Sequence, residues 1–149
     1  MQLERTFAML KPGVLQRRIA GDVIQRIEKK GFKIVGMKLM QVSRQLAEQQ
    51  YAEHKGKDFY EPLIDYTTSG PVIALVLERV DAINALRRLA GPTMVDTALP
   101  GTIRGDYAVS TRKNIIHASD SPESAQREIE LYFTPKEIHL YEDGHEQWY

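Results

Sequence analysis

Six consecutive apolar residues, Val72–Leu77 (V-I-A-L-V-L), constrain the possible fold more than any other segment of this chain. A strand with one solvated face alternates apolar and polar side chains, whereas an unbroken apolar run is typical of a central strand covered on both faces. A Ser-Gly-Pro turn precedes the run, and Asp81 after it favours the start of a helix that extends to Ala90. The segment therefore predicts a β-sheet with this strand in its interior.

The other apolar segments alternate with amphipathic ones along the chain. Their periodicity predicts further strands at Arg5–Leu10, Phe32–Val42 and Asp106–Ile116, and further helices at Ile19–Lys30, Ser43–His54, from Phe59 through Ile64, and from the capping cluster Ser119–Glu123 onward. In the second of these strands the apolar side chains change parity at Gly36, which indicates a β-bulge. The order is a split βαβ plan, so the expected fold class is α+β: a ferredoxin-like βαββαβ sandwich, in which helices cover one side of a four-stranded antiparallel sheet.

The composition suits a single domain over residues 1–149, because the chain is long enough to bury a core and 42% of it is hydrophobic. Its 20 basic and 20 acidic side chains cancel, so no overall charge attracts nucleic acid or an anionic membrane, and an anion site would have to be local. The absence of cysteine excludes disulfides and thiolate metal sites. Without a signal-peptide core or a long apolar run, we expect a soluble, cytoplasmic enzyme or binding module.

A histidine stands in Asn114–Ser121 (N-I-I-H-A-S-D-S), where an apolar run ends and a helix is expected to begin. Free backbone N–H groups and the positive end of the helix dipole favour anions at such a turn. Imidazole is a good nucleophile near neutral pH, so His117 could accept a phosphoryl group; alternatively, it only terminates the strand and binds a carbonyl. Glu128 lies on the apolar face of the following helix and needs a partner, for which His117 is the nearest candidate.

Other isolated residues could belong to the same anion site. Lys11 directly follows a predicted strand, which would hold it at a sheet edge, although a solvated turn lysine would give the same pattern. Phe59 ends a polar loop and offers a ring on which a nucleobase could stack, unless it simply fills the core. The irregular loop 91–105 is rich in glycine and proline, is long enough to indicate a function, and carries Thr93 and Arg104.

Taken together, these motifs resemble those of nucleoside diphosphate kinases. The resemblance rests on the histidine motif and on P-G-T-I-R-G-D at Pro100–Asp106, a highly specific combination. Y-A-E-H-K-G-K-D-F-Y (51–60), S-G-P-V (69–72) and S-A-Q-R-E-I (124–129) match the same family in the same order. The resemblance runs from about Arg5 to Phe133 and so covers nearly the whole domain.

The resemblance implies a role for each candidate residue. Members of this family transfer the γ-phosphoryl group of a nucleoside triphosphate, mainly ATP, to nucleoside diphosphates by a ping-pong mechanism through a phosphohistidine. His117 corresponds to the nucleophile, which attacks through Nδ1, and Glu128 to the acid that binds the imidazole on its backbone side and orients it. Phe59 corresponds to the aromatic residue that stacks on the base, and Tyr51 to the tyrosine near the histidine and the lysine. The positions that hold phosphates and ribose hydroxyls correspond to Lys11, Arg87, Thr93, Arg104 and Asn114.

The resemblance also implies a cofactor and partners. Mg²⁺ is expected to bridge the nucleotide phosphates and to arrive with the nucleotide, because no carboxylate cluster stands ready to cage a metal. A base held mainly by stacking gives a broad nucleotide range, and neither a specific nucleic acid nor a membrane is expected as a partner. Family members with an aromatic tail like residues 134–149 tend to be homo-hexamers, with a tetramer as the alternative. We expect the tail to pack on a neighbouring subunit.

Three places depart from the family pattern. Gly13 stands in place of an aspartate, Asp58 in place of a proline, and the 94–99 segment lacks the proline that commonly follows the threonine. These changes bear on the turn after Lys11, on the lid over the base and on subunit contacts, respectively.

Other functions also fit a ferredoxin-like fold. A catalytically weak nucleotide-binding or regulatory protein would keep the fold, although the intact set of candidate residues argues against it. An RNA-binding or small-molecule-binding module is disfavoured by the zero net charge and by the absence of an aromatic RNA-binding strand. A metal site built on His54, His117, His139 and His145 is disfavoured because their spacing matches no familiar ligand pattern.

Overall fold

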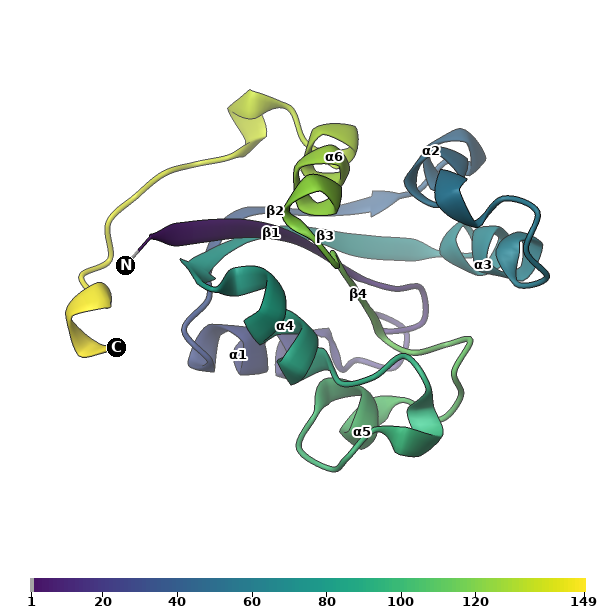
Figure 1. The fold of residues 1–149 in the computed structure, drawn as a ribbon, viewed down its shortest axis with the longest axis horizontal. Coiled ribbons are helices and arrows are strands. Elements are labelled where there is room, and N and C mark those ends of the chain that lie inside the picture. The colour runs from purple at the N-terminus through teal and green to yellow at the C-terminus, as the bar shows by residue number, and fades with distance from the viewer. Residues whose placement is uncertain (1) are drawn as a thin grey trace.

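The computed structural model describes residues 2–149, which form a four-stranded antiparallel sheet with helices packed on it (Figure 1). The strands are β1 (Leu3–Leu10), β2 (Lys33–Gln41), β3 (Pro71–Val80) and β4 (Ile116–Ala118). The helices are α1 (Ala20–Lys29), α2 (Arg44–Gln50), α3 (Tyr60–Thr67), α4 (Ala82–Ala90), α5 (Ile103–Tyr107) and α6 (Pro122–Tyr132). Short 3₁₀ turns are η1 (Ala52–His54), η2 (Val95–Thr97), η3 (Pro135–Glu137) and η4 (Glu146–Trp148). The strand order β2-β3-β1-β4 confirms the predicted α+β, ferredoxin-like class.

The strand predicted from the long apolar run is β3, which lies between β2 and β1. Residues 72–77 are all buried, and their side chains enter two separate cores in alternation. One core takes Ile73, Leu75 and Leu77, and the other takes Val72, Ala74 and Val76. A strand that is apolar on both faces thus divides the interior of the molecule into two layers.

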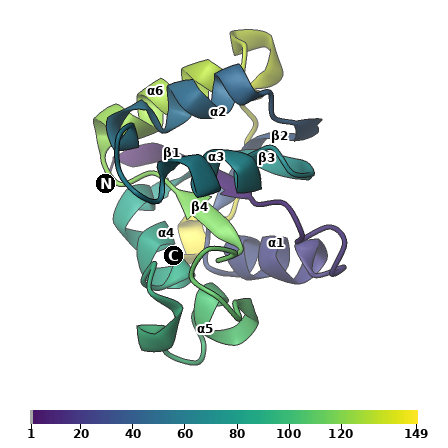
Figure 2. The same ribbon diagram turned by 90° about the vertical axis from the view of Figure 1, so that its right-hand side faces the viewer.

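Helices cover both faces of the sheet, so the prediction of helices on one side only is wrong. The helices α1 and α4 pack on one face, while α2, α3 and α6 pack on the other (Figure 2). The reason lies in β3 itself, because leaving either of its apolar faces in water would cost about 25 cal/mol for each Å² left uncovered.

The bulge predicted at Gly36 is confirmed. The register between β2 and β3 shifts between Ile34 and Gly36. A Cβ atom at this glycine would lie 3.2 Å from side-chain atoms of both Val76 and Phe133. Glycine is therefore required for the close approach of β2 to β3 and to the segment that follows α6.

The long final strand predicted at Asp106–Ile116 is wrong, since only Ile116–Ala118 pairs with β1. The preceding residues form α5 and a loop instead. Thr102 begins α5 by accepting a hydrogen bond from Gly105 N, and a Cβ on Gly105 would overlap the carbonyl oxygen of Leu99. Ile115, with φ 78°, forms a tight turn in which Ile116 N donates to Asn114 O, which keeps it out of the strand.

The predicted helix caps are confirmed at Ser43 and at Ser121, whose hydroxyl groups accept hydrogen bonds from Leu46 N and Ser124 N. Asp81 precedes α4 as predicted, but its side chain does not cap that helix. Asp81 adopts a left-handed backbone conformation. The free N–H of Ile83 in the first turn of α4 instead donates to Glu4 Oε1 on β1, at 2.8 Å. The carboxylate of Glu4 therefore caps α4 in place of the carboxylate of Asp81.

The segment after α6 returns along the edge of β2 (Figure 1). His139 N donates to Val35 O at 2.8 Å, and the Tyr141 hydroxyl donates to Ile34 O at 2.5 Å. Near its end, the ring of Tyr149 lies against Gly31. These contacts fix the path of the tail on its own chain. Within residues 2–149, every helix is too short or too polar to cross a bilayer.

Candidate active site

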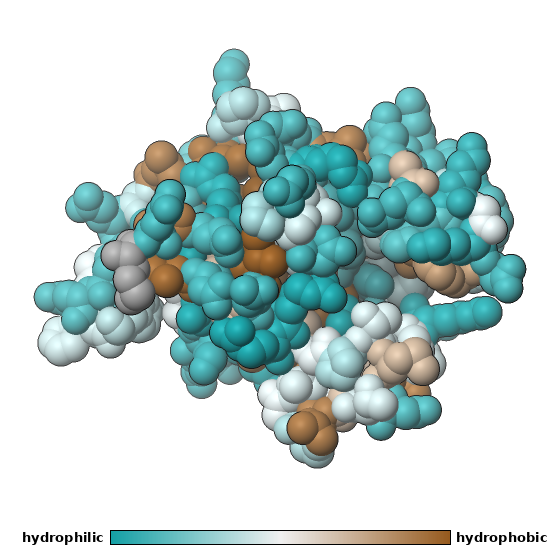
Figure 3. All heavy atoms as spheres, in the orientation of Figure 1, coloured by the Kyte–Doolittle hydropathy of each residue, from teal (hydrophilic) through white to brown (hydrophobic). Residues whose placement is uncertain are grey.

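A cavity of about 370 Å³ opens where β4 meets the start of α6. Figure 3 shows a recess on this side of the molecule, between the α2–α3 segment and the segment that carries α5. Residues from both segments and from α4, β4 and α6 line it, together with Lys11 directly after β1. The structure brings all nine predicted site residues to this one cavity: Lys11, Tyr51, Phe59, Arg87, Thr93, Arg104, Asn114, His117 and Glu128.

His117 is the middle residue of β4, and pairing with β1 fixes its backbone opposite Met9. Its side chain is 16% exposed and opens to the cavity. The ring of Tyr51 meets it edge-on, with 5.7 Å between the ring centroids. Packing therefore holds the imidazole between the sheet and the wall of the cavity.

Glu128 binds the imidazole of His117 at Nε2, the ring nitrogen farther from the main chain. Glu128 Oε1 lies 2.9 Å from His117 Nε2, whereas Nδ1 contacts no hydrogen-bonding partner in the described chain. The expectation that Glu128 binds the ring on its backbone side is therefore wrong, because Nε2 is the nitrogen farther from the main chain. A carboxylate at Nε2 favours the tautomer that carries the proton there, which leaves a lone pair on Nδ1.

Ser119 completes this arrangement and was not among the predicted residues. Its buried hydroxyl donates to Glu128 Oε1 at 2.5 Å, the same oxygen that faces His117. Two hydrogen bonds thus fix one carboxylate that is itself only 3% exposed. The sequence did hold a signal for Ser119, because it stands two residues after His117, and residues two apart in an extended segment point to the same side.

Two buried cations, Lys11 and Arg104, form the positive part of the cavity wall. Lys11 Nζ donates to Asn114 Oδ1 at 2.9 Å. Burial, together with the nearby charge of Arg104, lowers the pKa of Lys11 to about 7. Burial and the charge of Arg87 lower the pKa of Arg104 to about 10. Within residues 2–149 neither cation pairs with a carboxylate, so the cavity has uncompensated positive charge suited to an anion.

Arg104 also holds the main chain around the histidine. Its guanidinium donates to three carbonyl oxygens, those of Gly91 at 2.7 Å, Asn114 at 3.2 Å and Ile116 at 2.6 Å. Arg87 similarly donates to Ala118 O at 3.1 Å. The two arginines thereby tie the end of α4 to both sides of β4, and each keeps further N–H donors for a ligand.

Two aromatic side chains among the predicted residues also line the cavity. Phe59 is 46% exposed, with its ring tilted against that of His54 at a centroid distance of 5.1 Å. Tyr51 is buried, which raises the pKa of its hydroxyl, and this hydroxyl has no hydrogen-bond partner within residues 2–149. An unpaired buried hydroxyl beside a cavity is suited to a polar ligand atom.

Several lining residues gave no distinct signal in the sequence. They are Glu53, His54, Pro62, Leu63, Thr111, Arg112, Ala118, Asp120 and Ser124. The departure at Gly13 has a local explanation, because its φ of 98° suits glycine and its N–H donates to Gln16 Oε1 at 3.0 Å. In the described part of the chain, no three histidine, aspartate or glutamate side chains converge on a point where a metal ion could bind.

Comparisons with known proteins agree with this geometry. The family model described as nucleoside diphosphate kinase matches residues 4–138. A nucleoside diphosphate kinase of Listeria monocytogenes serotype 4b is 56% identical over 146 residues, which cover 98% of this chain and 99% of the relative. One from Archaeoglobus fulgidus is 51% identical over 146 residues, covering 98% of this chain and 97% of the relative.

Solved structures show the same fold. A halophilic nucleoside diphosphate kinase from Halobacterium salinarum, described in complex with CDP, superposes with a TM-score of 0.95 at 43% identity and covers 99% of this chain and 98% of its own. The Aquifex aeolicus enzyme gives a TM-score of 0.89 at 37% identity, covering 92% and 99%. Sequence and structure match over nearly the full length and include the segments that build the cavity. The chain belongs to the nucleoside diphosphate kinase family of phosphotransferases.

Proposed function

We propose that this enzyme transfers the γ-phosphoryl group of a nucleoside triphosphate, mainly ATP, to nucleoside diphosphates through a phosphohistidine on His117. The observation that supports this most directly is the state of the imidazole, whose Nε2 is held by Glu128 while Nδ1 makes no hydrogen bond within residues 2–149. A second group that orients and polarises a nucleophile is the general requirement for nucleophilic catalysis. The relative described with CDP supports nucleoside diphosphates as ligands.

In the first half-reaction the lone pair of His117 Nδ1 attacks the γ-phosphorus. The bond from that phosphorus to the β,γ-bridging oxygen breaks, and its electron pair leaves with the nucleoside diphosphate. In the second half a terminal β-phosphate oxygen of the acceptor attacks the same phosphorus, and the P–N electron pair returns to Nδ1. Glu128, held by Ser119, keeps the proton on Nε2 and stabilises the positive charge that develops on the ring.

The other candidate residues are proposed to position the nucleotide, since phosphoryl transfer depends mainly on positioning and charge stabilisation. Lys11 and Arg104 face the transferred group, and their charges are uncompensated in the chain described. The exposed ring of Phe59 stacks on the base. Tyr51 offers its unpaired hydroxyl near the histidine. The remaining contacts to phosphates and ribose come from Arg87, Thr93 and Asn114.

The residues present fit a Mg²⁺ ion that arrives with the nucleotide. Glu128 is already engaged by two donors, and the other carboxylates of the cavity, Glu53 and Asp120, are exposed at its rim. Mg²⁺ generally binds through substrate phosphates and keeps several waters, and the exposed carboxylates of Glu53 and Asp120 would be free to accept hydrogen bonds from those waters. The ion supplies neutralisation of charge on the phosphates during transfer.

Changing Glu128 to Gln is expected to slow formation of the phosphoenzyme by about 10- to 100-fold without abolishing it, because an amide still orients the ring but no longer stabilises its charge. Rapid quench of enzyme mixed with labelled ATP measures this rate. Glu130→Gln is the matched control, since Glu130 lies on the same helix and is exposed. An unchanged rate for Glu128→Gln would remove the carboxylate from the mechanism.

Nucleotide binding is expected to take up a proton above pH 7. With a pKa of about 7, Lys11 is mostly neutral in the free enzyme at pH 8, whereas phosphate beside it favours the ammonium form. Affinity for ADP should therefore fall as pH rises from 7 to 9, and below pH 6 the uptake should vanish because the lysine is already charged. Calorimetry in buffers of different ionisation enthalpy measures the uptake. It should disappear in Lys11→Met and persist in Lys113→Met; an uptake that survives in Lys11→Met would assign the proton elsewhere.

Steady-state kinetics test the order of events. A ping-pong mechanism gives parallel double-reciprocal plots for ATP at several concentrations of CDP, because the first product leaves before the acceptor binds. Intersecting lines would indicate a ternary complex with direct transfer, and the proposal of a phosphohistidine intermediate would fail.

We further propose that the enzyme works in the cytoplasm as a homo-oligomer, a hexamer rather than a tetramer. The support is family resemblance together with the exposed aromatic end of the tail, where the Trp148 side chain is 79% exposed. Residues 134–149 would then bury part of this surface on a neighbouring subunit. Sedimentation equilibrium measures the mass, and a monomer at micromolar concentration would contradict the proposal.

A further inference from the structure

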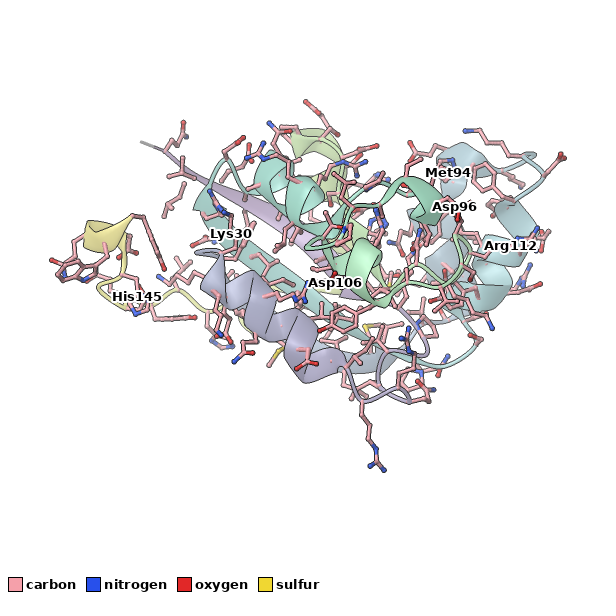
Figure 4. All side chains as sticks on the ribbon, turned by 90° about the horizontal axis from the view of Figure 1, so that it is seen from below. Lys30, Met94, Asp96, Asp106, Arg112 and His145 are labelled. Carbon is pink, nitrogen blue, oxygen red and sulfur yellow. The ribbon has the colours of Figure 1, made fainter. Side chains whose placement is uncertain are left out.

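Arg112 lies at the rim of the cavity and takes no part in the mechanism above. It lines the cavity together with Phe59, the residue proposed to stack on the base. The residue is exposed, and its guanidinium makes no hydrogen bond or ion pair with any residue of 2–149. Figure 4 shows it on the same side of the molecule as Met94 and Asp96. A free guanidinium at a ligand cavity is available to the ligand.

The backbone on both sides of Arg112 is fixed. The Thr111 hydroxyl accepts a hydrogen bond from Val95 N at 3.2 Å, which ties the loop to η2. On the other side, Asn114 is buried and bonded to Lys11. The side chain of Arg112 therefore extends from an anchored position, and less conformational freedom is lost when it binds than from a mobile loop.

The phosphate end of the cavity already has its cations. Lys11, Arg87 and Arg104 belong to the wall around His117, where Arg87 and Arg104 also donate to carbonyls of β4. Arg112 instead shares the cavity mouth with an exposed aromatic ring. A base stacked on that ring by its face would leave its edge free for hydrogen bonding.

A guanidinium distinguishes among base edges. Its donors form a planar fork that matches two adjacent acceptors, and guanine presents O6 and N7 in this arrangement. Adenine presents N7 beside an amino donor, and cytosine presents its amino donor, so neither offers the pair. An arginine at the edge of a bound base therefore favours guanine over adenine and cytosine.

We propose that Arg112 is a specificity-determining residue that reads the O6/N7 edge of the base and gives this enzyme a preference for 6-oxopurine nucleotides. The preference is superimposed on the broad range that stacking allows, and it rests on the proposed function of the same site. Because Arg112 is exposed and water competes for its donors, the effect is modest, about three- to tenfold in kcat/KM.

The test compares five acceptors, GDP, IDP, 7-deaza-GDP, ADP and CDP, with ATP as donor. IDP retains both acceptor atoms, whereas 7-deaza-GDP lacks only N7. The wild-type enzyme should use GDP and IDP about three- to tenfold better than the other three. Arg112→Ala should reduce kcat/KM for GDP and IDP to the level of ADP and CDP and leave the latter unchanged. Arg112→Lys should lose most of the preference, since an ammonium cannot form the fork.

Lys113→Ala is the matched control, because Lys113 is an exposed neighbouring cation that does not line the cavity. An equal loss for all acceptors in Arg112→Ala would assign the residue to the phosphates and overturn the proposal. Equal use of GDP and 7-deaza-GDP by the wild type would overturn it as well. Failure of the proposed function is distinguishable, since the wild-type enzyme would then form no phosphoenzyme with ATP at all.

Discussion

Replacing His117 by Ala is expected to lower the rate of phosphoryl transfer by at least about 10⁴-fold, the largest effect of any single substitution in the chain. The loss follows from removal of the atom that forms the bond to phosphorus. Binding should change little, because the cations and the stacking ring remain in place. Coupled-assay turnover with ATP and CDP measures the rate, and calorimetry with ADP measures the affinity.

His139→Ala is the control for this substitution. His139 is exposed on the tail, outside the cavity, and bonds to β2 through its backbone N–H rather than through its ring. It should retain full turnover. A His117→Ala enzyme that still turned over at more than a few per cent of the wild-type rate would show that transfer does not pass through this imidazole.

Replacing Arg104 by Ala is expected to lower the free energy of unfolding by about 3–5 kcal/mol, beyond its effect on catalysis. The guanidinium is 7% exposed and donates to three main-chain carbonyls, those of Gly91 after α4 and of Asn114 and Ile116 just before the histidine. Its removal leaves the carbonyl oxygens of Gly91 and Ile116 without this donor, leaves Asn114 O with only the bond from Ile116 N, and opens a void between α5 and β4. Arg104→Lys should recover little of the loss, because a single ammonium cannot reach three carbonyls in different directions.

Urea unfolding followed by circular dichroism measures this change, with all variants at one protein concentration because assembly affects apparent stability. Arg88→Ala provides the comparison, since Arg88 is exposed on α4 and, within residues 2–149, forms an ion pair only with Asp81, at 3.5 Å. It should cost less than about 0.5 kcal/mol. An Arg104→Ala midpoint equal to that of Arg88→Ala would contradict the anchoring role given to Arg104.

The part of the site that could be predicted from sequence is the part determined by local geometry. A histidine ending a strand and a glutamate on the buried face of the next helix are eleven positions apart, and the carboxylate needs a buried partner. That pairing follows from burial alone. The nitrogen that Glu128 contacts could not be predicted, because it depends on the rotation of the ring within its packed surroundings.

The segment before His117 shows where sequence patterns fail. Residues 106–116 contain enough β-branched and aromatic side chains to suggest a strand, yet residues 106–115 form the end of α5 and a loop, and β4 begins only at Ile116. Their path is decided by side-chain and long-range bonds: the hydrogen bonds from Arg104 to three carbonyls, and the bond from the distant Lys11 N to Ile115 O at 2.8 Å. Such tertiary bonds leave no periodic signal.

The two covered faces of the sheet, by contrast, were implicit in the sequence. Val72–Leu77 is apolar at every position, which requires a helical layer on each side, whereas the split βαβ order alone indicates only one. The side-chain pattern therefore predicted the layers better than the order of elements did. The left-handed Asp81 is a different case, because the carboxylate that caps α4 comes from β1.

The most direct test of the mechanism is a pulse and chase without steady-state turnover. Enzyme, Mg²⁺ and ATP labelled in the γ-phosphate are mixed, nucleotide is removed, and unlabelled GDP or CDP is added. The label should stay on the protein as an acid-labile, alkali-stable phosphate, on Nδ1 of His117, and then leave completely to either acceptor. If ATP binds but no label remains on the protein, transfer is direct or absent, and the phosphohistidine mechanism is wrong.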